Sequence, residues 1–174
     1  PSVAENGLDM RFMVNTVAPY VLTKRLLTTL GPQGRVINLS SAAQAPVDFG
    51  AMQGSRQLDH SNAYAQSKLA LTMWSNHMAH ELADDGPVVV AVNPGSFLGT
   101  KMVKEAYGSD GNDIRIGVDI LVTASISDAF ANASGRYYDN DARAFADPHP
   151  DALDQRKNAA LVDAIEAIIA AIST

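Results

Sequence analysis

Tyr64 and Lys68 are the residues of this sequence whose types and spacing are best suited to chemistry. They lie near the start of a segment whose pattern predicts a long helix, four positions apart. Both side chains are therefore expected on one helix face, one turn apart. A positive charge beside a phenol favours its ionised form, which makes a proton donor or acceptor for neutral pH. The alternative is a tyrosine ring packed on the aliphatic stem of a lysine, which is common on helices.

Two serines end the strand that should lie beside this helix. Residues 34–41 read Gly-Arg-Val-Ile-Asn-Leu-Ser-Ser, a short β-branched run that predicts a buried parallel strand. Ligands of open α/β sheets bind outside the carboxyl ends of the strands, where Ser40 and Ser41 fall. Serine is also common in the turns that end strands, so a structural role is the alternative.

The remaining pattern alternates strands and helices. The helix of Tyr64 is expected to be capped by Ser61 or Asn62 and to end near Asp84 or Asp85. A second buried strand is predicted at 88–92, and such a strand–helix–strand unit is a right-handed crossover between parallel strands. Further elements are expected as a helix over about 8–30 weakened at Pro19, an amphipathic helix around 114–122, a short strand at 135–139 and a C-terminal helix reaching Ile172.

Composition bounds the class of protein. The 174 residues are 47% hydrophobic and 18% charged, and they carry a net charge of −6 and no cysteine. We expect one domain over 1–174, without disulfides or thiolate metal sites. The negative net charge does not favour binding to nucleic acid or to an anionic membrane, and no apolar run reaches the ~20 residues of a membrane span. A cytoplasmic protein is expected.

Four motifs resemble the short-chain dehydrogenase/reductase family, in that family's order. They are Asn15 in a helix, Val-Ile-Asn-Leu-Ser-Ser at 36–41, Tyr-Ala-Gln-Ser-Lys at 64–68, and Asn-Pro-Gly at 93–95. The sequence around Tyr64 is most similar to the retinol dehydrogenase and protochlorophyllide reductase-like branch. The resemblance implies an α/β fold, a Rossmann-type doubly wound parallel sheet, and an NAD(P)-dependent oxidoreductase that interconverts a carbonyl and an alcohol.

The resemblance also implies roles for four catalytic residues. Tyr64 would be the general acid/base that exchanges a proton with the substrate oxygen. Lys68 would make the Tyr64 hydroxyl more acidic, and Ser41 would polarise the carbonyl. Asn15 would anchor a water relay that connects Lys68 to solvent.

The cofactor side is implied in the same way. Tyr64 and Lys68 would hold the ribose, Pro94 and Gly95 would lie along the nicotinamide, and Thr100 would touch the carboxamide or a phosphate. Thr100 stands one residue further from Pro-Gly than the family usually places it. The choice between NAD and NADP stays open.

A larger departure concerns the dinucleotide. The family's glycine-rich turn, Thr-Gly-x-x-x-Gly-x-Gly, is absent from the sequence, as are the strands and helix around it. The chain is therefore expected to form the catalytic half of the fold, lacking its N-terminal nucleotide-binding strands. The strand at 34–39 should then have an unpaired edge, which predicts marginal stability or completion by another chain. The alternative function is a non-catalytic remnant or binding module.

Other signals suggest weaker alternatives. His77, His80 and Glu81 cluster on the central helix, where a solvated or interface face is favoured over a metal site. A nucleophilic Ser41 is disfavoured because Gly-x-Ser-x-Gly is absent.

Trp74 and Met78, one turn apart, are expected in the core or in a subunit interface. In the family the helix at 64–84 builds a dimer interface, so the resemblance implies a homo-oligomer. The loop at 42–60 and the segment at 96–111 are expected to wall the pocket of a small-molecule substrate. Their apolar side chains are Phe49, Met52, Leu58, Phe97, Met102 and Tyr107.

Overall fold

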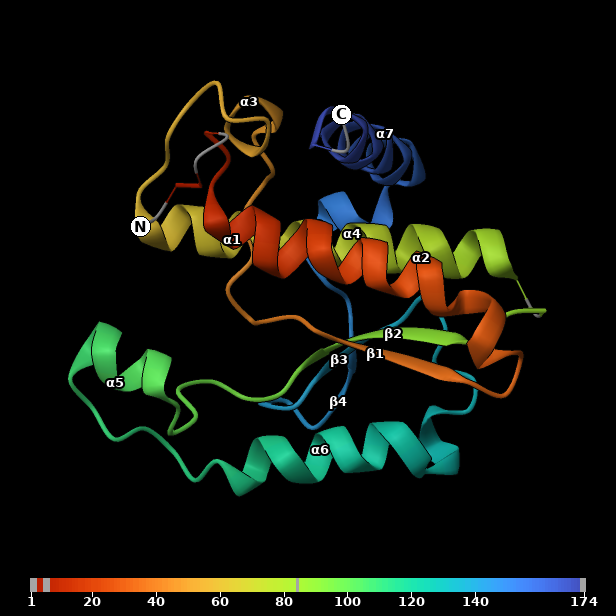
Figure 1. The fold of residues 1–174 in the computed structure, drawn as a ribbon. Helices are drawn as coiled ribbons and strands as arrows, with labels where there is room; N and C mark the ends of the chain where they lie inside the picture. Colours follow the sequence, from red (N-terminus) through yellow and green to blue (C-terminus); the bar gives the residue numbers. More distant parts are fainter. Residues whose placement is uncertain (1–2, 5–6, 84, 173–174) are drawn as a thin grey trace.

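A four-stranded sheet lies between two layers of helices in the computed structural model, which describes residues 3–4, 7–83 and 85–172. Figure 1 shows α2 and α4 on one side of the sheet, α6 on the other, and α7 above α4. The elements are α1 (Met10–Phe12), the π-helical turn η1 (Met13–Val17), α2 (Ala18–Leu30), β1 (Arg35–Leu39), α3 (Phe49–Met52), α4 (His60–Leu82), β2 (Val88–Asn93), α5 (Lys101–Tyr107), α6 (Arg115–Ile126), the 3-10 turn η2 (Asp128–Phe130), β3 (Tyr137–Asp139), β4 (Ala144–Ala146), the 3-10 turn η3 (Pro150–Leu153) and α7 (Gln155–Ile172).

The sheet has the order β1-β2-β3-β4. β1 and β2 are parallel, with Arg35 opposite Val88, and β3 is parallel to β2. These pairings confirm the predicted parallel α/β sheet. β4 is antiparallel to β3 and was not predicted, so the sheet is mixed. β4 has three residues, of which Phe145 is the one with a large apolar side chain, and this pattern is too short to indicate a strand.

Alternating residues of β2 supply both hydrophobic cores. Val89 packs into the larger cluster with Leu69 and Trp74 of α4 and with Leu161 of α7. The other face carries Val90 and Val92, which join Ile120, Ala124, Phe130 and Ala133 beneath the sheet. The period of two along a strand thus separates one apolar run into two buried faces. Both layers fix β2, and β2 ends at the candidate site.

The central helix begins and ends slightly earlier than predicted. Asp59 is the N-cap of α4, since its carboxylate accepts hydrogen bonds of 3.0 Å from the backbone N–H groups of Ser61 and Asn62. The predicted caps are therefore wrong, because those two residues donate to the cap. The helix ends at Leu82 rather than near Asp85; Asp84 lies outside the described residues.

Pro19 disturbs the first helix in a specific way. Because proline has no N–H, the carbonyl four residues earlier, that of Asn15, lacks its normal helical donor. The chain forms the π-helical turn η1 around Asn15, and Pro19 then falls in the first turn of α2, where proline is tolerated. Such turns occur frequently at functional sites.

One edge of the sheet is open. Within the described residues, β1 pairs only with β2, as the sequence predicts. Exposed apolar side chains on β1 and on two helices that contact it include Leu39 on β1, Leu22 and Leu26 on α2, and Val122 on α6. The marginal stability expected from this edge stays a prediction. No helix in the described part of the chain is long and apolar enough to cross a membrane.

Candidate active site

Tyr64 and Lys68 lie together on the first turns of α4. The Lys68 Nζ atom is 5.6 Å from the centroid of the Tyr64 ring, and it donates a 2.7 Å hydrogen bond to the carbonyl of Leu39 at the end of β1. Burial lowers the pKa of Lys68 from 10.5 to about 8. At neutral pH this ammonium is still predominantly charged, so it places a positive charge beside the phenol. Two of its three N–H donors remain for other partners.

The π-helical turn is docked on the same part of α4. Asn15 Nδ2 donates a 3.0 Å hydrogen bond to Ser67 Oγ, and that hydroxyl donates to the carbonyl of Tyr64 at 2.7 Å. Thr16 Oγ1 donates to the carbonyl of Ser67 at 2.9 Å. Ser67 is fully buried, so these bonds fix η1 against the turn of α4 between Tyr64 and Lys68. Asn15 is thereby held beside the predicted catalytic pair.

The two serines after β1 have different surroundings. Ser40 is buried, and its hydroxyl lies 2.6 Å from Thr72 Oγ1, which indicates a packing role. Ser41 Oγ accepts a hydrogen bond from the backbone N–H of Ala43 at 3.1 Å, so its own proton remains available for donation. Tyr137 Oη donates to the Ser41 carbonyl at 3.1 Å. The second serine is therefore the one free to act on a ligand.

A cavity of about 310 Å³ brings most of the predicted site residues together. It lies at the carboxyl ends of β1 and β2, where parallel sheets bind ligands. Its lining includes Ser41, Tyr64, Lys68, Pro94, Gly95 and Thr100. Gly95 has φ of 125°, a conformation that favours glycine. Thr100 also caps α5, because its hydroxyl accepts from the backbone N–H of Val103 at 3.3 Å.

Asp141 organises the loop that carries Pro94 and Gly95, and the sequence analysis missed it. Its carboxylate accepts hydrogen bonds from Asn93 Nδ2 at 2.9 Å, from the backbone N–H of Ser96 at 2.9 Å and from Ser96 Oγ at 2.6 Å. Burial raises the pKa of Asp141, but the hydrogen bonds from Ser96 and Asn93 outweigh it and lower the pKa below the usual value. Its position just after a predicted strand was the available signal.

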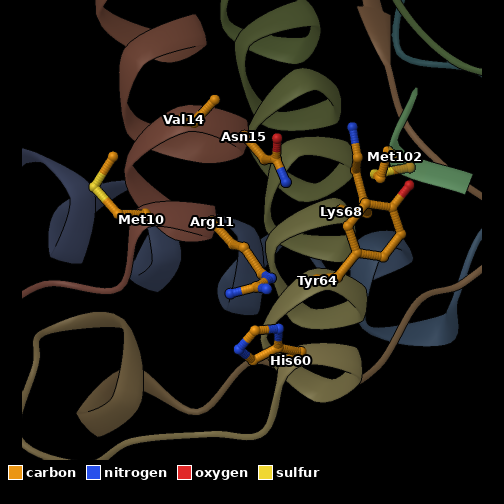
Figure 2. A pocket seen from close by; sticks show the side chains of 8 residues that line it. All are labelled: Met10, Arg11, Val14, Asn15, His60, Tyr64, Lys68 and Met102. Atoms are coloured by element: carbon orange, nitrogen blue, oxygen red, sulfur yellow. The ribbon is translucent and has the colours of Figure 1, made fainter. Parts of the chain in front are cut away.

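A second cavity, of about 690 Å³, meets the first at Tyr64 and Lys68. Figure 2 shows its lining from α1, η1 and α4, with Asn15 beside Tyr64 and Lys68. Arg11 and His60 also line it, and neither was singled out from the sequence. Each lies four positions before a predicted site residue, Asn15 and Tyr64 respectively, and that helical spacing could have identified both.

The weaker signals have structural explanations. His77 Nε2 lies 3.4 Å from Glu81 Oε1 on the surface of α4. Trp74 is completely buried and Met78 is buried, which confirms the core interpretation of these residues.

Met102 lines both cavities and Phe97 lines the smaller one, whereas the side chain of Tyr107 lies outside the described residues.

The sequence matches the family described as short chain dehydrogenase over residues 2–110. The chain belongs to this family. Among curated proteins it is similar to retinol dehydrogenase 13 of Mus musculus, with 36% identity over 96 residues, covering 52% of this chain and 29% of that protein. It is 33% identical to polyprenol dehydrogenase of Homo sapiens over 122 residues, covering 59% of this chain and 37% of that protein. The retinol dehydrogenase-like branch expected from the sequence agrees with these relatives.

Solved structures show the same fold. An uncharacterised protein from Mycobacterium paratuberculosis superimposes with a TM-score of 0.71 at 21% identity, covering 96% of this chain and 61% of that one. A short chain dehydrogenase from Shigella flexneri, complexed with NADP, has a TM-score of 0.56 at 24% identity, covering 75% and 52%. The chain spans half or less of the curated relatives that it matches.

Proposed function

We propose that this chain is the catalytic part of an NAD(P)-dependent oxidoreductase that interconverts a carbonyl and an alcohol, with Tyr64 as general acid/base. The observation that carries the proposal is the convergence of Ser41, Tyr64 and Lys68 with Pro94 and Gly95 on one cavity at the strand ends. Membership of a family of dehydrogenases and the names of the retinol and polyprenol relatives support it.

The residues present fit one end of a dinucleotide. The lining of the cavity of about 310 Å³ includes the Lys68 ammonium, which has two donors to spare, and the backbone turn at Pro94 and Gly95, which suits a ribose and a nicotinamide ring. When bound, a nicotinamide cofactor supplies or accepts the hydride. The sequence has no glycine-rich turn for the pyrophosphate, so the other end needs residues from elsewhere.

The chain's own residues then handle the substrate oxygen and its proton. In reduction, the Ser41 hydroxyl donates a hydrogen bond to the carbonyl oxygen, and Tyr64 Oη gives it a proton as negative charge develops. The Lys68 ammonium stabilises the resulting phenolate, and Asn15 anchors the water that returns a proton. Oxidation of an alcohol uses the same groups in reverse, with Tyr64 accepting the proton.

The competing proposal is a binding module that keeps this constellation without catalysis. The absent glycine-rich turn and the open edge of β1 are the observations that favour it. Self-association through α4 also stays a proposal, and the exposed side chains of that helix are polar: His60, Ser61, Asn62, His80 and Glu81.

Tyr64→Phe tests the enzymatic proposal, because it removes only the hydroxyl. We expect turnover of an aldehyde panel with NADPH or NADH to fall by about 10²–10⁴-fold. Tyr138→Phe is the matched control, since that ring packs against Phe130 and Phe145 away from both cavities. Unchanged turnover in the Tyr64 variant would refute the acid/base role. Failure of the intact chain to bind either cofactor in a fluorescence titration would favour the binding module.

A further inference from the structure

We propose that Arg11 and His60 form an anion-binding end of the larger cavity, so that the substrate is an oxo or hydroxy compound with a carboxylate. The inference rests on the proposed function, since it deepens the description of the substrate. It assigns a role to two side chains that the catalytic scheme does not use.

The charge of the cavity lining is the first argument. The whole chain carries a net charge of −6, yet the charged or ionisable groups that line this cavity are Arg11, His60, Lys68 and the phenol of Tyr64. Among the residues that the structure describes, no carboxylate belongs to the lining. Lys68 is engaged at the catalytic end, where it donates to the Leu39 carbonyl. The other two basic side chains are thus left to face the cavity from α1 and α4.

The state of the Arg11 guanidinium is the second argument. Its side chain is only 24% exposed, and its N–H groups make no hydrogen bond to any residue that the structure describes. The Asp9 carboxylate lies 4.0 Å from Arg11 Nη1, and it already accepts a 2.7 Å hydrogen bond from the backbone N–H of Arg11. Because the Arg11 side chain is partly buried, unused guanidinium donors are costly to desolvate, and a carboxylate can accept two of their hydrogen bonds in parallel.

His60 supplies the third argument through its position. Figure 2 shows the Arg11 and His60 side chains reaching toward each other below the ring of Tyr64. The carboxylate that precedes His60 in the sequence, that of Asp59, is engaged by the backbone N–H groups of Ser61 and Asn62 and does not line the cavity. Two basic side chains from different helices therefore converge at a place where none of the described lining residues is acidic.

Helix geometry sets the distance between the two ends of the substrate. His60 lies four residues before Tyr64 on α4, which corresponds to about 6 Å along the helix. The apolar side chains of Met10, Val14 and Met102 lie along the same cavity. We therefore infer a substrate with a reacting carbonyl, a short apolar middle and a terminal carboxylate. 6-Oxohexanoate has this form, and its methyl ester is a neutral counterpart.

The experiment compares these two compounds on the intact chain and on single variants. Binding is measured by saturation-transfer NMR, and turnover by the loss of NADPH absorbance. In turnover, a hydride from NADPH adds to the aldehyde carbon and a proton to its oxygen, which yields the alcohol and NADP. The variants are Arg11→Gln and His60→Gln, with Arg25→Gln on the exposed face of α2 as the matched control. Circular dichroism checks that each variant is folded.

We expect the chain to bind the carboxylate about tenfold more tightly than the ester, and Arg11→Gln to remove that preference. His60→Gln should reduce the preference by a smaller factor, and Arg25→Gln should leave it unchanged. Equal binding of both compounds, binding of neither, or an equal effect of Arg11→Gln on both would overturn the inference. A preference that depends on Arg11 without turnover would support the inference while contradicting the proposed function. Turnover of both compounds without preference would support the proposed function while contradicting the inference.

Discussion

Lys68→Met provides the most quantitative test of the site, because it removes a largely buried charge. The ammonium is partly buried between α4 and the end of β1, and this burial lowers the pKa of Lys68 from 10.5 to about 8. Methionine keeps a flexible chain of similar length and has no charge. The comparison between the two proteins therefore isolates the titration of one group.

The direction of the effect follows from proton linkage. Below about pH 8 the lysine is protonated in both the folded and the unfolded chain, so the cost of burying the charge is fully present. Between pH 8 and 10.5 the unfolded chain binds more protons than the folded chain, so the free energy of unfolding rises with pH. At 1.36 kcal/mol per pH unit, this interval corresponds to about 3 kcal/mol.

The assay is urea unfolding of both proteins at a series of pH values from 7 to 10.5. The unfolding free energy of the unchanged chain should rise relative to Lys68→Met by up to about 3 kcal/mol across this range. Burial also raises the pKa of Tyr20 and Tyr137, so both proteins lose stability together above about pH 10, and this loss cancels in the difference.

Lys101→Met is the matched control, since that lysine is exposed on α5 and should show no such dependence. A constant difference between the unchanged chain and Lys68→Met from pH 7 to 10.5 would refute the reasoning. It would mean that water or a nearby group keeps the Lys68 ammonium solvated, and that the pKa of Lys68 is not lowered in the folded chain.

Two further predictions concern the elements that position the site. Arg35 Nη1 donates to the carbonyls of Ala124 and Ser127 at 3.0 and 2.7 Å, so Arg35→Met should lower the unfolding free energy by about 2 kcal/mol in urea; an unchanged midpoint would show that α6 does not depend on these bonds. Asp141→Ala removes the acceptor for the Ser96 backbone N–H, so amide exchange at Ser96 should become about tenfold faster by NMR. In the unchanged chain, protonation of the carboxylate should weaken this protection at acid pH, and only below the usual range because the pKa of Asp141 is lowered. Equal protection of the Ser96 amide in both proteins would contradict the role of Asp141.

Much of the fold follows from local patterns. The β-branched runs at 35–39 and 88–92 predicted the parallel pair β1–β2, because such runs are stable only when covered on both faces. The helix at 60–82 was equally clear from its length, although its cap was assigned to the wrong residues. Short elements such as β4 and α3 were missed, since three or four residues carry too little periodicity.

Some residues of the candidate site were likewise indicated by the sequence, and others only by the tertiary structure. Residue types and spacing by themselves indicated Tyr64, Lys68 and the serine pair at 40–41, because neighbours on one helix face or at one strand end can be paired without knowing the fold. The choice of Ser41 and the role of Asn15 came from the resemblance to the family. Only the tertiary structure brought Arg11 beside His60 and Asp141 beside Ser96, across 49 and 45 positions of the chain. Such contacts depend on how helices and loops pack, and packing joins residues that no local periodicity relates.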